Sequence, residues 1–564
     1  MSRVDHKAAA ESKETMDTHR LVSFLQSPAT YPDHPSQVEC IETHISWVFR
    51  TPHYAYKLKK AVQFPFLDFS KLAQREWACR EELRLNRRMA ANVYLDVMPI
   101  TSDGKSLQLN GRGTVVDWVV RMRRLQDAQN LCNRLNAGRV STQDIDGLAS
   151  FLADFYRGQP PIAVQVEDYR RTLNRLVCEN RDELSAGAHQ LPRLTVERIH
   201  AAQLQLLHLA PEVFDVRVLD GRIIDGHGDL RPEHIYLNGS PLVIDCVEFN
   251  SELRRIDVVD ELAYLAMECD YLNAPALGEA VLNRYLKLSA DRPPRVLVPF
   301  YKSYRAIVRA KVSVLRESQA MHEASPACRD TAARQHGNAE MYLDLAGRYA
   351  AHIGRPLMIV VCGVSGTGKT TIAQQLQEFL SCRHLQTDEI RRRIFPIPSE
   401  SSAFDAGIYQ AEHRDAVYEE MFRLAEEYLR DGLSVILDGT FLVAALRTRA
   451  AAIAATHGAG LFVLRCEASK SSACRRIAQR AAAGGSLSDA RPEFYDKQLA
   501  AWQEDTAALP GLCVDTSDDS PFDSEAICRG LRQAAFAEED LMAGDSLAVA
   551  SSGRNEPAME RAAP

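Results

Sequence analysis

The sequence of 564 residues has no apolar run long enough to cross a lipid bilayer. Its first twenty residues are polar and lack the apolar segment of a secretory signal. No two of the 13 cysteines form a C-x-x-C pair, which disfavours a disulfide framework or a zinc site. The chain also shows no internal repeat. These absences predict a cytoplasmic protein with reduced thiols and no membrane partner.

Excess positive charge and aromatic–basic stripes are also missing. The chain carries 67 Lys and Arg against 75 Asp and Glu, a net charge of −8. We therefore expect nucleic acid to be an unlikely partner. The composition, 46% hydrophobic and 25% charged, is typical of a globular protein. The length is too great for one core and predicts two to four units.

Residues 357–371 carry a phosphate-binding motif between a strand and a helix. The apolar run Leu-Met-Ile-Val-Val-Cys leads into G-x-x-x-x-G-K-T at 363–370, and a helical pattern follows. The glycines let consecutive N–H groups face phosphate oxygens. We expect Lys369 to reach the outer phosphates and the Thr370 hydroxyl to bind Mg²⁺. The predicted nucleotide-binding residues are Gly363, Val364, Ser365, Gly366, Thr367, Gly368, Lys369, Thr370 and Thr371.

Three further features lie in the same unit. A short strand at 384–387 leads into Asp388, and Arg391 follows at the spacing of one helical face. A helix over 406–430 precedes a buried strand that ends in Asp438, where a carboxylate can hold Mg²⁺ beside the P-loop. After a strand at 461–465, a helix carries Arg475, Arg476 and Arg480. We expect Arg476 and Arg480 to close over the triphosphate.

Each feature has a simpler interpretation. Asp388 and Arg391 could form a helix cap with a surface ion pair. Asp438 could be a turn residue, and the arginine helix a solvated face.

Together these elements resemble the small P-loop kinases, which include polynucleotide kinases, gluconate-type kinases and zeta-toxin-like enzymes. The resemblance covers about 185 residues. It implies catalytic roles for two residues outside the phosphate-binding loop. Asp388 would orient or deprotonate the acceptor hydroxyl, and Arg391 would grip the acceptor. Lys369 of the loop is also predicted to be a catalytic residue.

The N-terminal part contains the sequence Ile-Asp-Gly-His-Gly-Asp-Leu-Arg-Pro-Glu-His at 224–234. An Asn-Gly pair at 238–239 then predicts a tight hairpin, whose return strand ends in Asp245. The hairpin places Asp229 and Asp245 at the same edge. One carboxylate can then accept a hydroxyl proton while the other binds the metal of a nucleotide.

This arrangement resembles the aminoglycoside-phosphotransferase branch of the protein-kinase-like fold. The resemblance implies that Asp229 is the catalytic base, that Asp245 binds metal, and that residues 260–263 support the loop. His234 occupies the position of a metal-binding asparagine, although imidazole is a poor ligand for Mg²⁺. The strand at 54–59 would hold the phosphate-binding Lys57 against Glu82, with Lys59 and Lys60 as competing lysines. Residues 113–123 would lead to the adenine-binding hinge.

The fold class predicted is an α+β bilobal kinase-like domain followed by an α/β P-loop domain with a parallel sheet. The expected units are a disordered tail at 1–20, the kinase-like domain at 21–350, the P-loop domain at 354–542 and a disordered tail at 543–564. The kinase-like domain would divide into a small lobe at 21–125 and a large lobe at 126–350. The whole layout resembles bacterial fusions of an aminoglycoside phosphotransferase with an ATP-binding protein.

The main hypothesis is a bifunctional ATP-dependent kinase that uses ATP and Mg²⁺ in both halves and phosphorylates a hydroxyl of a small molecule. A second hypothesis makes the N-terminal unit a regulatory module without catalysis. It rests on His234 and on Thr51-Pro52-His53, which stand where the family has a glycine-rich turn. A third makes the C-terminal unit a polynucleotide 5′-hydroxyl kinase, because of the basic run at 391–393. The sequence does not indicate the acceptor or the oligomeric state.

Overall fold

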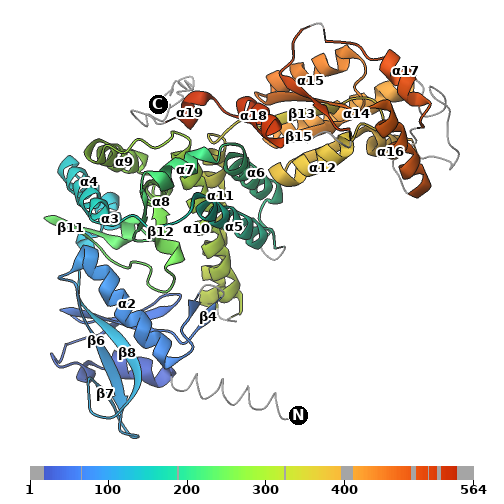
Figure 1. Cartoon of the computed structure of the whole chain (residues 1–564). Helices are drawn as coiled ribbons and strands as arrows, with labels where there is room; N and C mark the ends of the chain where they lie inside the picture. The colour runs from blue at the N-terminus through green and yellow to red at the C-terminus, as the bar shows by residue number, and fades with distance from the viewer. Residues whose placement is uncertain are drawn as a thin grey trace, which may run out of the picture.

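The computed structural model describes residues 18–64, 67–186, 190–322, 326–395, 411–483, 491–505, 507–517 and 523–542. Figure 1 shows three parts in a row: a small sheet with one long helix, a helical lobe, and an α/β unit at the far end. No helix within these ranges is long and apolar enough to cross a membrane. Of the expected tails, residues 1–17 and 543–564 lie outside the described residues, whereas 18–20 begin a helix over 18–26.

The small lobe is a six-stranded antiparallel sheet with the order β1-β2-β3-β8-β6-β7 and with helix α2 on one face. Helix α2 (Leu72–Ala90) lies between β5 and β6 in the chain and carries Glu82. A short hairpin of β4 (Gln63–Phe64) and β5 (Leu67–Asp68) precedes it. The sheet strands are β1 (Glu39–Glu42), β2 (Ser46–Arg50), β3 (Tyr54–Lys59), β6 (Tyr94–Ser102), β7 (Leu107–Leu109) and β8 (Thr114–Arg123).

Strand β3 is buried on both faces. Tyr56 and Leu58 pack in a cluster with Leu25 of the helix over 18–26. Ala55 packs in a second cluster together with Cys79 of α2. Successive side chains of a strand point to opposite faces, so Lys57 and Lys59 share the face of Ala55. The helix over 18–26 therefore covers the outer face of the sheet. The sequence analysis placed the first residues of this helix, 18–20, in a disordered tail.

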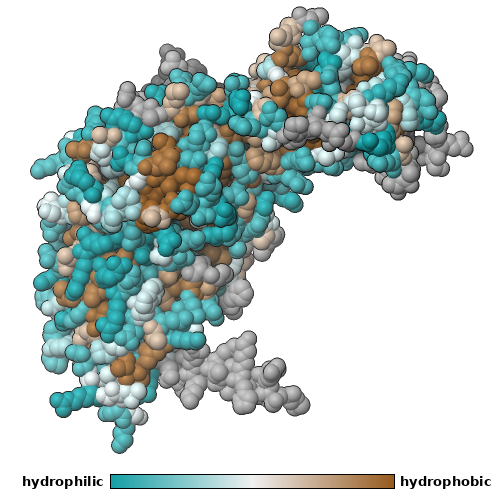
Figure 2. Space-filling view, viewed as in Figure 1, coloured by the Kyte–Doolittle hydropathy of each residue, from teal (hydrophilic) through white to brown (hydrophobic). Residues whose placement is uncertain are grey.

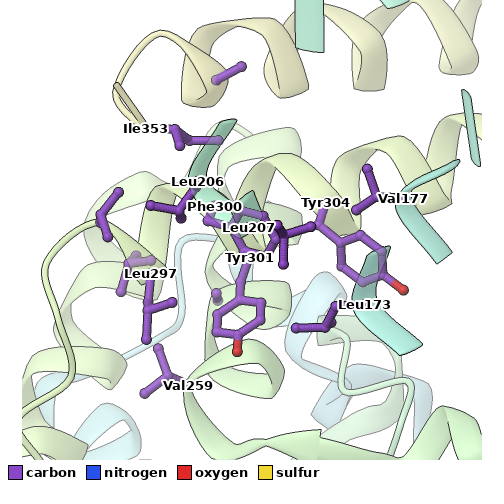
Figure 3. Close-up of a cluster of buried hydrophobic side chains, with 14 of the residues drawn as sticks. Leu173, Val177, Leu206, Leu207, Val259, Leu297, Phe300, Tyr301, Tyr304 and Ile353 are labelled. Carbon is purple, nitrogen blue, oxygen red and sulfur yellow. The ribbon is translucent and has the colours of Figure 1, made fainter. Parts of the chain in front are cut away.

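The large lobe packs its helices around a core of large apolar side chains. Figure 3 shows Leu206, Phe300 and Tyr301 in this core, beside Ile353 of the connection to the last unit. Helix α8 is buried over most of its length. The helices are α3 (Leu131–Asn136), α4 (Thr142–Arg157), α5 (Val166–Ser185), α6 (Arg193–Leu209), α7 (Glu212–Leu219), α8 (Val258–Tyr271), α9 (Pro275–Ser289), α10 (Leu297–His322) and α11 (Pro326–Ala350).

Two pairs of short antiparallel strands interrupt these helices. Strand β10 (Ile235–Asn238) pairs antiparallel with β11 (Ser240–Val243), and Gly239 turns between them with φ +74°. This confirms the hairpin that the Asn-Gly pair predicted. A second pair joins β9 (Ile223–Asp225) to β12 (Arg255–Asp257).

The last unit is a five-stranded parallel sheet with the order β14-β15-β13-β16-β17. Two expected boundaries change: Thr387 and Asp388 begin helix α13 instead of ending a strand, and α14 is described from Ala411, because 406–410 lie outside the described residues. The strands are β13 (Leu357–Cys362), β14 (Arg383–Gln386), β15 (Val435–Asp438), β16 (Gly460–Glu467) and β17 (Gly511–Asp515). The helices are α12 (Lys369–Leu380), α13 (Thr387–Ile394), α14 (Ala411–Arg430), α15 (Ala444–Thr456), α16 (Lys470–Ala483), α17 (Phe494–Ala500), α18 (Ser524–Ala535) and α19 (Glu538–Leu541).

Helix α6 joins the large lobe to the P-loop unit. Its buried Gln205 donates to the Arg355 carbonyl at 2.9 Å and accepts from the Ser434 hydroxyl at 3.3 Å. His208 stacks on Phe379 of α12 with ring centroids 4.6 Å apart. One hydrophobic cluster continues from the large lobe into this unit. Both observed folds confirm the predicted fold class.

Replacement of Gln205 by Leu tests this junction. The change leaves the Arg355 carbonyl without its buried partner, so we expect the free energy of unfolding to fall by about 1–3 kcal/mol. Chemical denaturation monitored by circular dichroism gives the value. Arg193→Ala on the same helix removes only an exposed pair with Glu197 and should cost less than about 1 kcal/mol. Equal costs for the two variants would contradict a structural role for Gln205.

Two candidate active sites

The first candidate site begins with Lys57 on β3. Its ammonium lies 2.9 Å from Glu82 of α2 and 2.5 Å from Asp245, which follows the β10–β11 hairpin. Burial would lower the pKa of Lys57, but Asp245, Glu82 and Glu248 outweigh it and raise this pKa well above its usual value. The structure thus brings together the predicted lysine, helical glutamate and metal-binding aspartate, from three separate elements.

Lys59 lies deeper on the same strand and is fully buried. It forms ion pairs with Glu82 and with Glu248, three residues after Asp245. Glu82 therefore holds two lysines, which sequence reasoning treated as competing candidates. The pair with Glu82 joins β3 to α2, and the pair with Glu248 joins the sheet to the large lobe. Lys60 instead pairs with the exposed Glu42.

Two more residues of α2 contact the backbone near Asp245 and Asp229. The Asn86 side chain accepts a hydrogen bond from the Cys246 amide at 2.9 Å. Arg88 donates to the carbonyls of Asp225 and Gly226 at 2.8 Å each. Sequence reasoning missed these contacts. The position of Asn86, four residues after Glu82 and hence on the same helical face, is the signal that could have found it.

Asp229 lies in the loop before the hairpin, with 27% of its side chain exposed. It accepts a hydrogen bond from Tyr264 at 2.9 Å and pairs with Arg231 at the same distance. Burial would raise the pKa of Asp229, but Arg231, His234 and Arg309 lower it below its usual value. The carboxylate is therefore ionised near neutral pH, as a proton acceptor requires.

Glu261 holds the Asp229 loop through hydrogen bonds to two backbone amides. Its carboxylate accepts hydrogen bonds from the amides of His227 and Gly228, both at 2.7 Å. Gly228 has φ +83°, and a Cβ there would lie 3.0 Å from the Leu253 carbonyl, so glycine suits this position. Within 260–263, Glu261 makes the contact with the loop, whereas Asp260 pairs with Arg305.

His234 lies between the two aspartates. Its Nδ1 is 2.9 Å from the Asp229 carbonyl, and its Nε2 is 3.5 Å from the Asp245 carboxylate. Arg231 also reaches Nε2, at 3.2 Å. The imidazole thus stands where the resemblance implies a metal ligand.

Strand β8 covers most of the expected hinge strand at 113–123. It pairs with β3 on one side and β6 on the other, with Lys57 opposite Val120. Its end lies against the β2–β3 turn, because the Arg124 amide donates to the His53 carbonyl at 2.9 Å. The role of this strand in binding adenine stays a prediction.

The second candidate site is the loop between β13 and α12. Gly363, Gly366 and Gly368 have φ of +136°, +84° and +78°, so the loop curls as a phosphate-binding nest requires. Lys369 donates to the Val364 carbonyl at 2.8 Å. The Ser365 amide donates to the Gln498 side chain of α17 at 2.7 Å. Val364, Thr367 and Thr371 belong to the same loop and the first turn of α12.

Strand β15 places Asp438 beside this loop, opposite Val361 of β13. Asp438 is buried and lies 3.2 Å from His384 Nε2. The Thr370 hydroxyl accepts a hydrogen bond of 3.4 Å from Gln386. Asp438 therefore stands at the carboxyl end of a core strand, where a nucleotide site of this topology is expected.

The remaining predicted residues lie on helices α13 and α16. Asp388 and Arg391 form an ion pair within α13. Arg476 donates to the Thr516 carbonyl at 2.5 Å, and the Thr516 hydroxyl donates to the Thr367 carbonyl at 2.9 Å. Sequence reasoning missed Thr516, which only the pairing of β17 with β16 brings to the loop. Arg480, like Arg475, is exposed on α16.

The donor sets are compatible with nucleotide-bound Mg²⁺. In the part of the chain that the structure describes, no three His, Cys, Asp or Glu side chains form a metal-binding group. Each candidate site offers two groups: Asp245 with His234, and Thr370 with Asp438. Mg²⁺ commonly takes one or two protein ligands and completes its shell with phosphates and water. The carboxylates fit this ion, whereas the imidazole does not.

The buried pairs of Lys59 predict a large cost for its removal. Lys59→Met leaves Glu248 without its lysine in a buried site, so we expect a loss of about 3–5 kcal/mol in the free energy of unfolding. The neighbouring Lys60→Met, which loses a pair with an exposed glutamate, should cost no more than about 1 kcal/mol. Urea denaturation of both variants measures the difference. Similar values for the two would show that the buried network does not stabilise the fold.

Three comparisons bear on these sites. The family model of an AAA domain matches residues 358–504, which include the P-loop. A choline/ethanolamine kinase family protein from Mesorhizobium loti aligns with 59% of this chain and 99% of its own, at 13% identity and a TM-score of 0.37. A gluconokinase from Sinorhizobium meliloti aligns with 32% and 91%, at 19% identity and a TM-score of 0.23.

A longer match extends over both units. The uncharacterized protein Rv2004c of Mycobacterium tuberculosis is 34% identical to this chain over 474 residues, which are 83% of this chain and 90% of the relative. The alignment is longer than either unit alone, so it extends over parts of both. The chain therefore belongs to the family of Rv2004c.

Proposed function

We propose that this protein is an ATP-dependent phosphotransferase with two nucleotide-binding units, which transfers phosphate to a hydroxyl of a small molecule. The observation that carries the proposal is the grouping of Lys57, Glu82, Asp245 and Asp229 at the junction of the two lobes. These groups supply a cation for phosphate, a ligand for metal and a base for the acceptor. The P-loop unit supports a second nucleotide site.

In the N-terminal site, the acceptor hydroxyl would lie within hydrogen-bonding distance of Asp229. As the hydroxyl oxygen forms its bond to the γ-phosphorus, Asp229 takes the proton and ADP leaves. ATP with Mg²⁺ supplies the activated phosphoryl group. Tyr264 and Arg231 hold the Asp229 carboxylate in one orientation. Arg231 would also offset negative charge beside the transferred group.

In the C-terminal site, Lys369 would exchange the Val364 carbonyl for a phosphate oxygen. The loop amides and the N-terminus of α12 would bind the β-phosphate. Asp388 would then orient the acceptor hydroxyl, and Arg391 would hold the acceptor. Arg476 would approach the phosphates from α16, because Thr516 fixes it beside the loop. Arg480 would need α16 to move closer.

One observation favours the regulatory alternative for the N-terminal unit. Arg231 donates to His234 Nε2, so this nitrogen is not free for a metal in the observed arrangement. In this alternative the unit binds a ligand without catalysis and controls the P-loop site through α6. The polynucleotide alternative gains less support: Arg391 pairs with Asp388, and Arg393 with Glu420, which leaves little of the basic run for a phosphate backbone.

Single substitutions separate the two sites. In a phosphate-transfer screen with a metabolite library, Lys369→Ala should abolish the activity of the P-loop unit, lowering its rate about 10²–10³-fold. Asp229→Asn should lower a distinct activity about 10²–10⁴-fold. Labelled ATP and the intact chain serve for both assays. If Lys369→Ala removes all turnover while Asp229→Asn changes nothing, the N-terminal unit is regulatory.

His234→Asn tests the donor set of the N-terminal site. Asparagine supplies an oxygen ligand, which Mg²⁺ prefers to imidazole. We therefore expect the Mg²⁺ concentration for half-maximal, Asp229-dependent turnover to fall about tenfold. The assay uses the Lys369→Ala background, and His352→Asn, at an exposed position after α11, is the control. An unchanged Mg²⁺ dependence would show that residue 234 does not contact the metal.

A further inference from the structure

Helix α10 carries arginines toward the Asp229 loop. Arg305 donates to Asp260 at 2.7 Å, and Arg309, one turn further, pairs with Glu268 at 2.8 Å. Arg316 follows Arg309 by seven residues, which places it two turns along the same face. Within the described residues, Arg316 has no hydrogen bond and no ion pair. Its neighbour Glu317 contacts His336 instead.

The charges around Arg316 include those of the Asp229 loop. Burial lowers the pKa of Arg316, the positive charges of Arg309 and Arg231 lower it further, and Glu233 and Asp229 partly oppose this. A partly buried guanidinium beside two other guanidinium groups is unfavourable without a partner. Such a group gains most from a bound anion, which would offset this repulsion.

The carboxylates near Asp229 are already neutralised. Asp229 and Glu233 both pair with Arg231. Glu268 pairs with Arg309 and accepts a hydrogen bond from the Tyr342 hydroxyl. A cationic acceptor would have to compete with an arginine for each of these carboxylates. Among the described residues, these three carboxylates therefore offer little free negative charge to an aminoglycoside or an amino alcohol.

The turn between β1 and β2 of the small lobe comes near Arg316. It carries His44, whose pKa is lowered by burial and by the charge of Arg316, and which hydrogen-bonds to Gln319 of α10. Arg316 is therefore near both this turn and the charges of the Asp229 loop. Its position suits an anionic group carried by a molecule whose hydroxyl reaches Asp229.

We propose that Arg316, backed by Arg309, binds a carboxylate or phosphate group of the acceptor that the N-terminal site phosphorylates. The inference rests on the proposed function of that site. It assigns an anionic hydroxy compound as the substrate class, in place of the polycation that the aminoglycoside resemblance suggests. Arg316 would select the acceptor and leave nucleotide binding to Lys57.

The test measures binding with probes of one size and different charge. Isothermal titration uses the intact Lys369→Ala chain, saturated with a non-hydrolysable ATP analogue and Mg²⁺. Glycerate is the carboxylate probe, inorganic phosphate the phosphate probe, glycerol the neutral probe and serinol the cationic probe. We expect one or both anions to bind more tightly than glycerol and serinol. Whichever anion binds identifies the group that Arg316 recognises.

Substitutions then assign the binding to Arg316. Arg316→Ala should weaken anion binding about tenfold or more, and Arg316→Lys should retain part of it. Affinity for the ATP analogue should not change. Because Arg316 has no partner among the described residues, the alanine variant should keep the melting temperature of the parent. Arg348→Ala, which removes an exposed pair with Asp344 on α11, is the control and should bind anions normally.

Several results would overturn the inference. These are an absence of anion binding by the parent chain, tighter binding of serinol than of glycerate, and weaker analogue binding in Arg316→Ala with unchanged anion binding. A marked fall in the melting temperature of Arg316→Ala would likewise indicate a structural role. Failure of the proposed function gives a different result: Asp229→Asn leaves phosphate transfer unchanged while Arg316 still governs anion binding.

Discussion

The buried ion pairs of β3 are the interaction on which the kinase-like unit depends. Lys57 and Lys59 share Glu82 of α2, and each also reaches a carboxylate of the large lobe, Asp245 or Glu248. Removing such charges from water is unfavourable, so each must keep its partners. This requirement holds the sheet, the helix and the large lobe at one separation. The same separation sets the distance between Lys57 and Asp245, the lysine and the aspartate predicted to hold phosphate and metal.

A second constraint lies at α6, where the two units share one hydrophobic core. Gln205 bonds to Arg355, which precedes β13, and to Ser434, which precedes β15. Both strands lead directly to the nucleotide site: β13 into the P-loop and β15 to Asp438. A displacement of α6 would therefore reach the loop through two rigid strands. Figure 1 places the P-loop unit at the opposite end of the large lobe from the sheet, and the surface in the same view is largely hydrophilic (Figure 2).

Ion pairs hold predicted site aspartates in both units. Three aspartates with predicted site roles each pair with a cation: Asp229 with Arg231, Asp245 with Lys57 and Asp388 with Arg391. The cations near Asp229 and Asp245 also lower the pKa of these two carboxylates. Arg316 of α10 has no ion pair among the described residues, and the positive charges of Arg309 and Arg231 act on it. The unpaired charge indicates where an anion would stabilise the site most.

The sequence by itself determined the local elements: the glycine-rich loop, the Asn-Gly hairpin and the apolar strands, because turn chemistry and burial patterns act over a few residues. From the resemblance to a kinase-like fold, it also predicted that Lys57 pairs with Glu82. The 2.9 Å distance between the two side chains agrees with this prediction. Only the tertiary structure decided that Lys59 joins Glu82, that Thr516 holds Arg476, and that the helix over 18–26 covers the sheet. Those contacts join residues far apart along the chain, whose distance depends on how the layers pack rather than on any local pattern.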